Sequence, residues 1–194
     1  MHDIEPYFGW REKYIASDDR HSPFFGRHYS EFHFTQRIYN YYIHPQWDEF
    51  GSETLYLKLL FVDYDEKFAV IELLGEWNDC LNNDIMFLKR QVIDPLIKNG
   101  IYKFALILEN VLNFHGHEDS YYEEWADDLK DEKGWVCFLN TMDHIKEEME
   151  KTGIHYYVSL GFHLNGLEWR RKEPHFLIDE LEYRMNIATK QLRH

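Results

Sequence analysis

The run Tyr102–Leu108 constrains the fold most, because it is an almost unbroken apolar stretch of strand length. Such a run is typical of a strand that is covered on both faces, as in the parallel sheets of α/β proteins. On either side of it, β-favouring apolar runs alternate with segments whose apolar residues recur every three to four positions. This alternation predicts parallel strands joined by helical crossovers, and therefore an α/β fold.

The expected order of elements is β, β, β, α, β, α, β, α, β, α. A polar turn over 63–67 separates two of the strands and predicts an antiparallel hairpin before the crossovers. The expected strands are Arg37–Ile43, Thr54–Val62, Phe68–Leu74, Tyr102–Leu108, Trp135–Leu139 and Ile154–Leu160.

Four amphipathic helices are expected between and after these strands. Asn82, Asn83 or Asp84 is expected to cap the first, which runs to about Lys98 and which Pro95 should kink or shorten. The second opens with the capping-box pattern Ser120-Tyr121-Tyr122-Glu123. The third follows Thr141 and stops at Gly153, and the last covers Phe176–Leu192.

Residues 1–50 differ in composition from the rest of the chain. They hold 14 of the 34 aromatic residues but show little helical periodicity. So many rings cannot all remain in water, so we expect an aromatic-rich extension, residues 1–50, that packs on an α/β domain formed by residues 51–194. Tyr39, Tyr41, Trp47 and Trp77 are either core residues or the walls of a ligand pocket, and the core is the favoured interpretation.

The net charge of −14 argues against nucleic acid and anionic membrane surfaces as partners, because both would be repelled. Cys80 and Cys137 belong to no CxxC pair, which fits a reducing cytosol and argues against a thiolate zinc site. We therefore expect a cytoplasmic protein. Its oligomeric state is left open.

Several stretches are similar to a known family. Phe68–Glu76 resembles the strand and Gly-Glu turn that open the STAS domain, the fold of anti-sigma-factor antagonists and SpoIIAA-like proteins. Asp84–Lys98 matches the first helix of that domain, and Tyr102–Phe114 resembles its next strand and the loop that follows. Asn113-Phe114-His115-Gly116, followed by a helix that contains Trp125–Leu129, is closer to the SpoIIAA-like branch. The resemblance covers about residues 54–160 and implies a STAS/SpoIIAA-like mixed sheet with helices packed on it.

The chain departs from the family at the residue that a partner kinase phosphorylates. The Asp-Ser pair of the antagonists falls on Gly116-His117, where no hydroxyl group exists. Ser120 lies three residues later at the predicted start of a helix, where a phosphate would be favoured electrostatically. Ser120 is therefore a possible phosphosite, and the alternative is that it only caps its helix, which is the more common role of such a serine.

The loop and helix at 115–129 carry the candidate site. In the antagonists this helix faces the partner, and an acidic face here would suit a protein partner with a basic face. A solvated acidic face is the simpler alternative. The residues expected to bind the partner are His115, Ser120, Glu123, Glu124, Asp127 and Asp128.

His115, His117, Glu118 and Asp119 form the densest group of possible metal ligands, although their spacing is not specific for a metal site. Glu76, Asp79 and Glu109 would supply paired carboxylates if they converge at strand ends. Dinucleotide, P-loop, nucleophile-elbow and HExxH motifs are absent from the sequence, and no cofactor is expected.

The sequence thus favours a non-enzymatic regulatory or interaction module, although an enzyme is not excluded. The alternatives are a small apolar-ligand-binding protein and, less favoured, a metal-dependent enzyme that uses His115 and His117.

Overall fold

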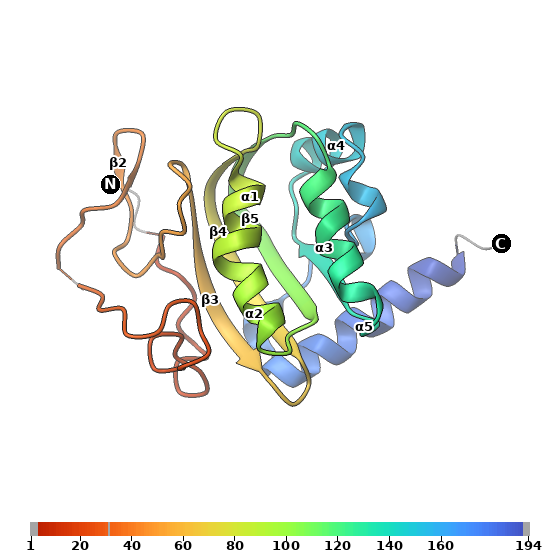
Figure 1. Ribbon diagram of the computed structural model, residues 1–194, viewed down its shortest axis with the longest axis horizontal. Helices are drawn as coiled ribbons and strands as arrows, with labels where there is room; N and C mark the ends of the chain where they lie inside the picture. The colour runs from red at the N-terminus through yellow and green to blue at the C-terminus, as the bar shows by residue number, and fades with distance from the viewer. Residues whose placement is uncertain (1–3, 31, 192–194) are drawn as a thin grey trace.

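A computed structural model describes residues 4–30 and 32–191 and is built around a four-stranded mixed sheet (Figure 1). The strands lie in the order β3-β4-β5-β6, with β3–β4 antiparallel and both β4–β5 and β5–β6 parallel. This arrangement confirms the predicted α/β fold, with an antiparallel hairpin followed by parallel crossovers. The strands are β3 (Leu55–Asp63), β4 (Phe68–Asn78), β5 (Lys103–His115) and β6 (Trp135–Leu139).

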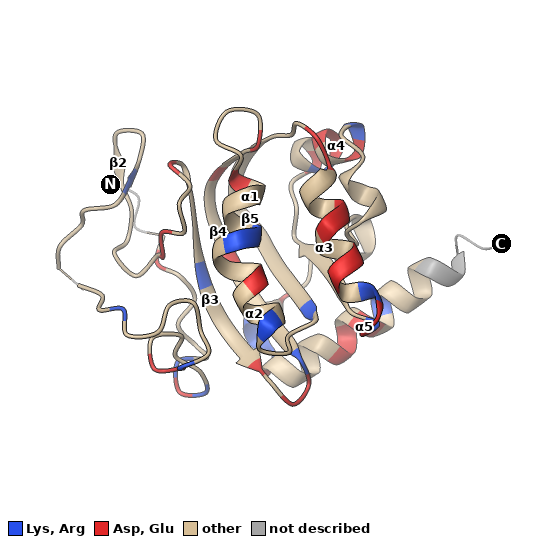
Figure 2. Cartoon of the chain, viewed as in Figure 1, with Lys and Arg blue, Asp and Glu red and all other residues tan. Residues whose placement is uncertain are grey.

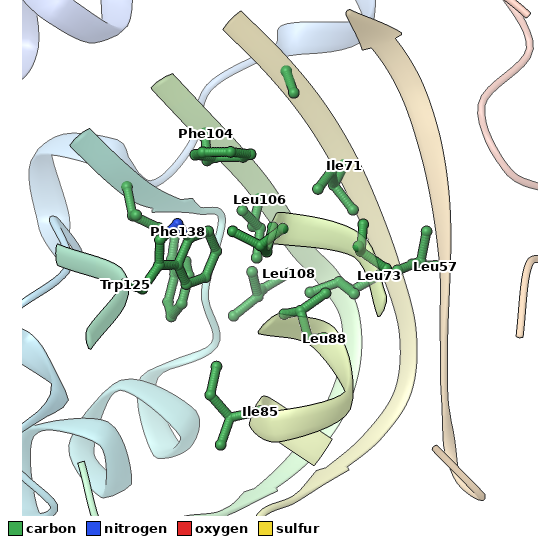
Figure 3. Packing of buried hydrophobic residues seen from close by; sticks show 14 of the residues in the cluster. Leu57, Ile71, Leu73, Ile85, Leu88, Phe104, Leu106, Leu108, Trp125 and Phe138 are labelled. Carbon is green, nitrogen blue, oxygen red and sulfur yellow. The ribbon is translucent and has the colours of Figure 1, made fainter. Parts of the chain in front are cut away.

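Helices cover both faces of the sheet. In Figure 1, α1, α2 and α3 lie in front of the strands and α5 lies behind them. Figure 3 shows the core of the front face, where Leu88 and Trp125 pack toward Leu106 and Phe138. The helices are α1 (Asp84–Leu88), α2 (Asp94–Lys98), α3 (Ser120–Lys130), α4 (Asp143–Lys151) and α5 (Pro174–Gln191). Leu192, expected as the end of the last helix, lies outside the described residues.

The first helix ends at Lys98 as predicted, so Pro95 does not shorten it, and the helix widens just before the proline. A π-helical turn, Lys89–Ile93, joins α1 to α2, and the Asp94 amide donates to the carbonyl oxygen of Lys89. Proline has no N–H group, and its ring would meet the carbonyl group four residues earlier in a regular helix. A wider turn accommodates the ring, so α1 and α2 continue in one direction (Figure 1).

The expected strand Arg37–Ile43 is two short strands instead. β1 (Arg37–Ile38) and β2 (Tyr41–Tyr42) form an antiparallel hairpin. The chain reverses at Tyr39, which has a φ of 52°, in the left-handed region. The rings of Tyr39 and Tyr41 are therefore exposed, whereas Trp47 and Trp77 are fully buried.

The expected strand Ile154–Leu160 is mostly a 3-10 turn, Ile154–Tyr156. Gly153 ends α4 in the left-handed conformation, and the amides of Tyr156 and Tyr157 donate to carbonyl groups three residues earlier. These local bonds leave little extended chain, so a single parallel bridge, Cys137 to Ser159, extends the sheet beyond β6. The C-terminal segment then includes the 3-10 turns Phe162–Leu164 and Trp169–Arg171 before α5 begins.

The N-terminal segment is irregular and runs beside β3 (Figure 1). It contributes buried side chains to each of the three apolar clusters, including Phe24 on the front face, Trp10 on the rear face and Trp47 beneath the β1–β2 hairpin. The division of the chain at residue 50 stays a prediction. Within 4–30 and 32–191, no helix is both long enough and apolar enough to span a membrane.

Candidate functional site at the carboxyl edge of the sheet

The carboxyl ends of β4 and β5 are held together and support the predicted site. Asn78 is paired with His115, and the amides of Asp79 and Cys80 donate to the carbonyl oxygen of His115 at 2.9 and 3.2 Å. The loop after β4 therefore lies directly against the loop that leads into α3. Ligands of open α/β sheets bind at this edge, because the loops there follow the carboxyl ends of parallel strands.

Asp79 is the polar centre beneath this edge. Its Oδ1 accepts hydrogen bonds from Trp77 Nε1 at 2.9 Å and from the Ile85 amide at 2.8 Å, and its Oδ2 accepts one from the Tyr122 hydroxyl at 2.8 Å. Burial raises the pKa of Asp79 to about 6, against the opposing effect of these hydrogen bonds. Asp79 thus fixes the start of α1 and the first turn of α3 with one carboxylate.

The predicted cap of the first helix is therefore wrong. Asn83 is the residue before α1, but it has a left-handed backbone and its side chain makes no capping bond. The bond from the Ile85 amide to Asp79 takes its place. The sequence contains no local signal for this, because Asp79 lies outside the usual capping position.

The predicted phosphosite, Ser120, is exposed at the first residue of α3. Asp119 precedes the helix, and no side chain caps it there, so the expectation that Ser120 caps α3 is wrong. Glu118 and Glu123 are exposed on the same loop and first turn. A phosphate on Ser120 would therefore meet favourable helix amides and unfavourable neighbouring carboxylates.

The predicted acidic face of α3 divides into two halves. Arg90 donates to both carboxylate oxygens of Glu124 at 2.5 and 2.7 Å, and the fully buried ammonium of Lys89 donates to Asp128 at 2.7 Å. In Figure 2, basic residues of the segment from α1 to α2 lie beside acidic residues of α3. Glu124 and Asp128 thus bind two cations of the chain itself.

The electrostatics agree with this pairing. Burial alone would lower the pKa of Lys89, but hydrogen bonds to Asp128 and Asp94 outweigh burial and raise it. The hydrogen bonds from Arg90 lower the pKa of Glu124. Glu123 and Asp127 are exposed on the other half of the helix surface, and no ion pair within the described residues involves them.

The four residues considered as possible metal ligands are not gathered into a ligand cluster in the part of the chain that the structure describes. His115 and His117 are exposed, and His115 Nε2 lies 3.1 Å from Asn113 Nδ2. The Nδ1 atom of His117 lies 3.9 Å from Glu118 Oε1. Within 4–30 and 32–191, no group of three or more His, Cys, Asp and Glu side chains is arranged to hold a metal ion.

Exposed apolar side chains flank the loop at 115–119. On one side, Cys80 Sγ donates to the carbonyl oxygen of Gly116 at 2.7 Å, and the adjacent Leu81 is 84% exposed. On the other side, a Cβ atom on Gly116 would lie 2.7 Å from Thr152 Cγ2, and Tyr156 just beyond is 78% exposed. We call this region the carboxyl-edge surface and define it by Leu81, His115, His117, Glu118, Ser120, Glu123, Asp127 and Tyr156.

Glu76, Asp79 and Glu109, which would supply paired carboxylates if they converged, have separate partners. Glu109 accepts a hydrogen bond from Trp169 Nε1 at 2.9 Å and pairs with Arg170, which also donates to Glu72 at 3.1 Å. Asp79 contacts the first and third helices instead, as described above. Glu76 accepts a hydrogen bond from the Tyr39 hydroxyl.

Glu72 was missed in the sequence because it lies within an apolar strand. It is 1% exposed, and its Oε2 accepts a hydrogen bond from the Tyr7 amide at 2.8 Å. Burial raises the pKa of Glu72 to about 7, although the Tyr7 amide and Arg170 oppose the shift. The Tyr7 hydroxyl donates to the carbonyl oxygen of Arg170 at 2.7 Å, so Glu72 lies where the N-terminal and C-terminal segments meet.

Comparisons with known proteins give matches among solved structures alone. No family model and no curated protein matches the chain. The chain is similar to the anti-sigma factor antagonist SpoIIAA in its unphosphorylated form, with 12% identity, a TM-score of 0.44, and coverage of 55% of this chain and 88% of that one. It is also similar to a putative anti-sigma factor antagonist from Thermotoga maritima, with 12% identity, a TM-score of 0.44, and coverage of 65% and 94%.

A third match is the Bacillus cell fate determinant SpoIIAA in its phosphorylated form, with 12% identity, a TM-score of 0.40, and coverage of 55% and 91%. These are structures of the family that the sequence resembles, and the likeness concerns the fold alone.

Proposed function

We propose that this chain is a non-enzymatic protein-interaction module that binds a basic segment of a partner protein through its carboxyl-edge surface. The observation that carries the proposal is the division of α3: Glu124 and Asp128 are neutralised within the chain, whereas Glu123 and Asp127 are exposed without a cation. Exposed Leu81 and Tyr156, on either side of the loop that leads into α3, provide the apolar contact area that protein interfaces need.

The charge of the chain favours the same kind of partner. A net charge of −14 attracts a basic protein over long range and repels nucleic acid. Cys80 and Cys137 are free thiols, which supports a reducing compartment such as the cytoplasm as the place of this interaction.

The first step of the test identifies the partner by photo-crosslinking from a chosen position on the carboxyl-edge surface. A photo-crosslinking amino acid is placed at Leu81, and, as the matched control, at Asp65 in the exposed turn between β3 and β4 at the opposite edge. A partner that crosslinks from position 81 and not from position 65 is then purified, and its affinity for the chain is measured.

The double variant Glu123→Lys/Asp127→Lys is expected to bind this partner at least about tenfold more weakly, because charge reversal in an interface costs more than 1 kcal/mol. The matched control is Asp65→Lys/Glu66→Lys, which makes the same charge change away from the surface. Equal affinity of the two double variants would overturn the proposal. Glu124 and Asp128 are left unchanged, because their reversal would disturb Lys89 and Arg90 and confuse folding with binding.

Ser120 offers a way to regulate the same surface. Its hydroxyl is exposed between Glu118 and Glu123, so a phosphate there would add negative charge where the basic segment binds. We expect the variant Ser120→Glu to bind the partner more tightly than Ser120→Ala does. Equal binding would remove this regulatory role and leave the interaction itself untouched.

A further inference from the structure

A cavity of about 210 Å³ lies between the β1–β2 hairpin and the carboxyl-terminal halves of β4 and β5. It is separate from the carboxyl-edge surface, since none of the residues that define that surface lines it. The lining residues are Ile38, Tyr39, Tyr41, Ile43, Leu74, Glu76 and Leu112.

The inner wall of this cavity is formed by buried, closely packed apolar side chains. Ile38, Ile43 and Leu74 are buried in one cluster with Trp47 and Tyr56 behind them. Gly75 permits the hairpin to lie close to β4, because a Cβ atom there would lie 3.0 Å from Ile38 Cδ1 and 2.1 Å from the carbonyl oxygen of Thr54. Gly75 also has a φ of 121°, which other residues rarely adopt.

The outer part of the cavity is aromatic. Tyr39, Tyr41 and Leu112 are each about half exposed or more, so the cavity opens to solvent between them. Rings that stand at the mouth of an apolar cavity provide faces for an apolar ligand and, through their negative π surfaces, for a cation.

Glu76 is the one charged side chain in the lining. Its carboxylate accepts a hydrogen bond from the Tyr39 hydroxyl, and no ion pair within the described part of the chain involves it. The other strand carboxylates differ: Glu72 and Glu109 both pair with Arg170. Glu76 is thus an uncompensated negative charge beside an apolar cavity and aromatic rings.

We propose that this cavity binds a small organic ammonium ion, with its apolar group against Ile43 and Leu74 and its ammonium group at the Glu76 carboxylate beside Tyr39. A charge-assisted hydrogen bond to Glu76 and the adjacent rings select a cation, while the apolar inner wall selects a hydrocarbon group. The cavity is smaller than those that hold drug-sized molecules, so the ligand has a single ring or a short alkyl chain.

Three probes of matched shape test the proposal: 2-phenylethylammonium, 2-phenylethanol and 3-phenylpropanoate. Each is titrated into the full chain while the methyl resonances of Ile43 and Leu74 are followed by NMR. We expect the ammonium probe to bind at least tenfold more tightly than the alcohol and the carboxylate probe to give no shifts. Absence of shifts with the ammonium probe at millimolar concentration would overturn the proposal, and so would equal binding of the ammonium and carboxylate probes.

Two variants assign the selectivity to the cavity. Glu76→Gln keeps the shape of the site but removes its charge, so the ammonium probe should bind no more tightly than the alcohol. Leu112→Lys places a cation at the exposed rim and should abolish binding of the ammonium probe without disturbing the core. Glu66→Gln, an exposed acid in the β3–β4 turn, is the matched control and should bind as the unmodified chain does. Retention of the ammonium preference in Glu76→Gln would show that the ligand binds elsewhere and overturn the proposal.

Discussion

On the front face of the sheet, α1–α4 pack against the strands, and on the rear face the irregular segments around Tyr7 and Trp169 lie beside α5. A helix satisfies its own backbone hydrogen bonds, so the front face needs little more than apolar side chains. In irregular segments, backbone and side-chain N–H groups need hydrogen-bond acceptors from other parts of the chain. Glu72 accepts a hydrogen bond from the Tyr7 amide and Glu109 accepts one from Trp169 Nε1, so carboxylates of the strands anchor the rear face.

Lys58 is a further polar residue that distinguishes the rear face from the front face. It is paired with Glu72 in the β3–β4 register and therefore lies on the rear face, where it donates to Asp48 at 3.1 Å. Asp48 is fully buried and also accepts from Arg27 at 3.2 Å and from Tyr29 at 2.5 Å. The rear face and its edge thus depend on polar pairs that join distant parts of the chain, whereas the front face is mainly apolar and has buried polar groups at Asp79 and Lys89.

The largest loss of unfolding free energy is expected from a substitution of Asp48. Asp48→Asn leaves the Lys58 ammonium without its buried counter-charge, and removal of one partner of a buried pair costs about 3–5 kcal/mol of unfolding free energy. Urea denaturation measures this loss. Asp65→Asn, in an exposed turn, is the control and should change stability by less than about 0.5 kcal/mol. A loss at Asp48 as small as that of the control would show that the polar pairs do not hold the rear face.

The pH dependence of stability should come from both faces. Burial raises the pKa of Glu72 to about 7 and that of Asp79 to about 6, above their ordinary values. The folded chain therefore holds protons that the unfolded chain has released, so the unfolding free energy falls as pH rises from about 4 to 7. Each group contributes up to about 3 kcal/mol, at 1.36 kcal/mol per pKa unit.

Two variants separate these contributions. Glu72→Gln should flatten the slope between pH 5 and 7, and Asp79→Asn should flatten it mainly between pH 4 and 6. Denaturation series at several pH values provide the measurement. An unfolding free energy that instead rises with pH in the unmodified chain would contradict the assignment.

A smaller effect is expected from the front-face polar centre. Tyr122→Phe removes the hydroxyl that donates to Asp79 Oδ2 while keeping the buried ring. Loss of one hydrogen bond to a charged group should lower the unfolding free energy by about 1.5–3 kcal/mol, less than at Asp48. Thermal unfolding monitored by circular dichroism tests the difference. A loss equal to that of Asp48→Asn would remove the contrast between the two faces.

The smallest change in unfolding free energy is expected from substitutions that distinguish the two halves of the acidic face of α3. Glu124→Lys breaks the paired hydrogen bonds with Arg90, but both side chains are partly exposed, so the expected loss is about 0.5–1 kcal/mol. Glu123→Lys has no cation to lose and should change stability by less than about 0.5 kcal/mol. Denaturation of the two variants side by side is the measurement, and the reverse order would contradict the division of the acidic face.

Much of the front face was predictable from the sequence, because its signals are local. The apolar run Tyr102–Leu108 gave the central strand β5, and the spacing of Tyr122, Trp125 and Leu129 gave the inner face of α3, where all three are buried. The hairpin of β3 and β4 followed from two apolar runs and the turn between them.

The rear face and the details of the site were not predictable in the same way. Glu72 and Arg170 are 98 positions apart, and no period in the sequence joins them. The prediction of a strand at Ile154–Leu160 was wrong, because the β-favouring residues after Gly153 form the local hydrogen bonds of a 3-10 turn. The acidic residues of α3 can be read from the sequence, but their division into paired and unpaired acids requires knowledge of where Lys89 and Arg90 lie.

The π turn between α1 and α2 has a consequence for chain length. Such a turn holds one residue more than an α-helical turn, so removal of one residue there leaves the helix on either side facing as before. Gln91 is exposed within the turn, whereas its neighbours Val92 and Ile93 are buried. Deletion of Gln91 should therefore be tolerated if Pro95 becomes Ala at the same time, because a regular helix has no room for the proline ring. This segment can thus change in length by a residue while Ile85 and Leu96 keep their places in the core.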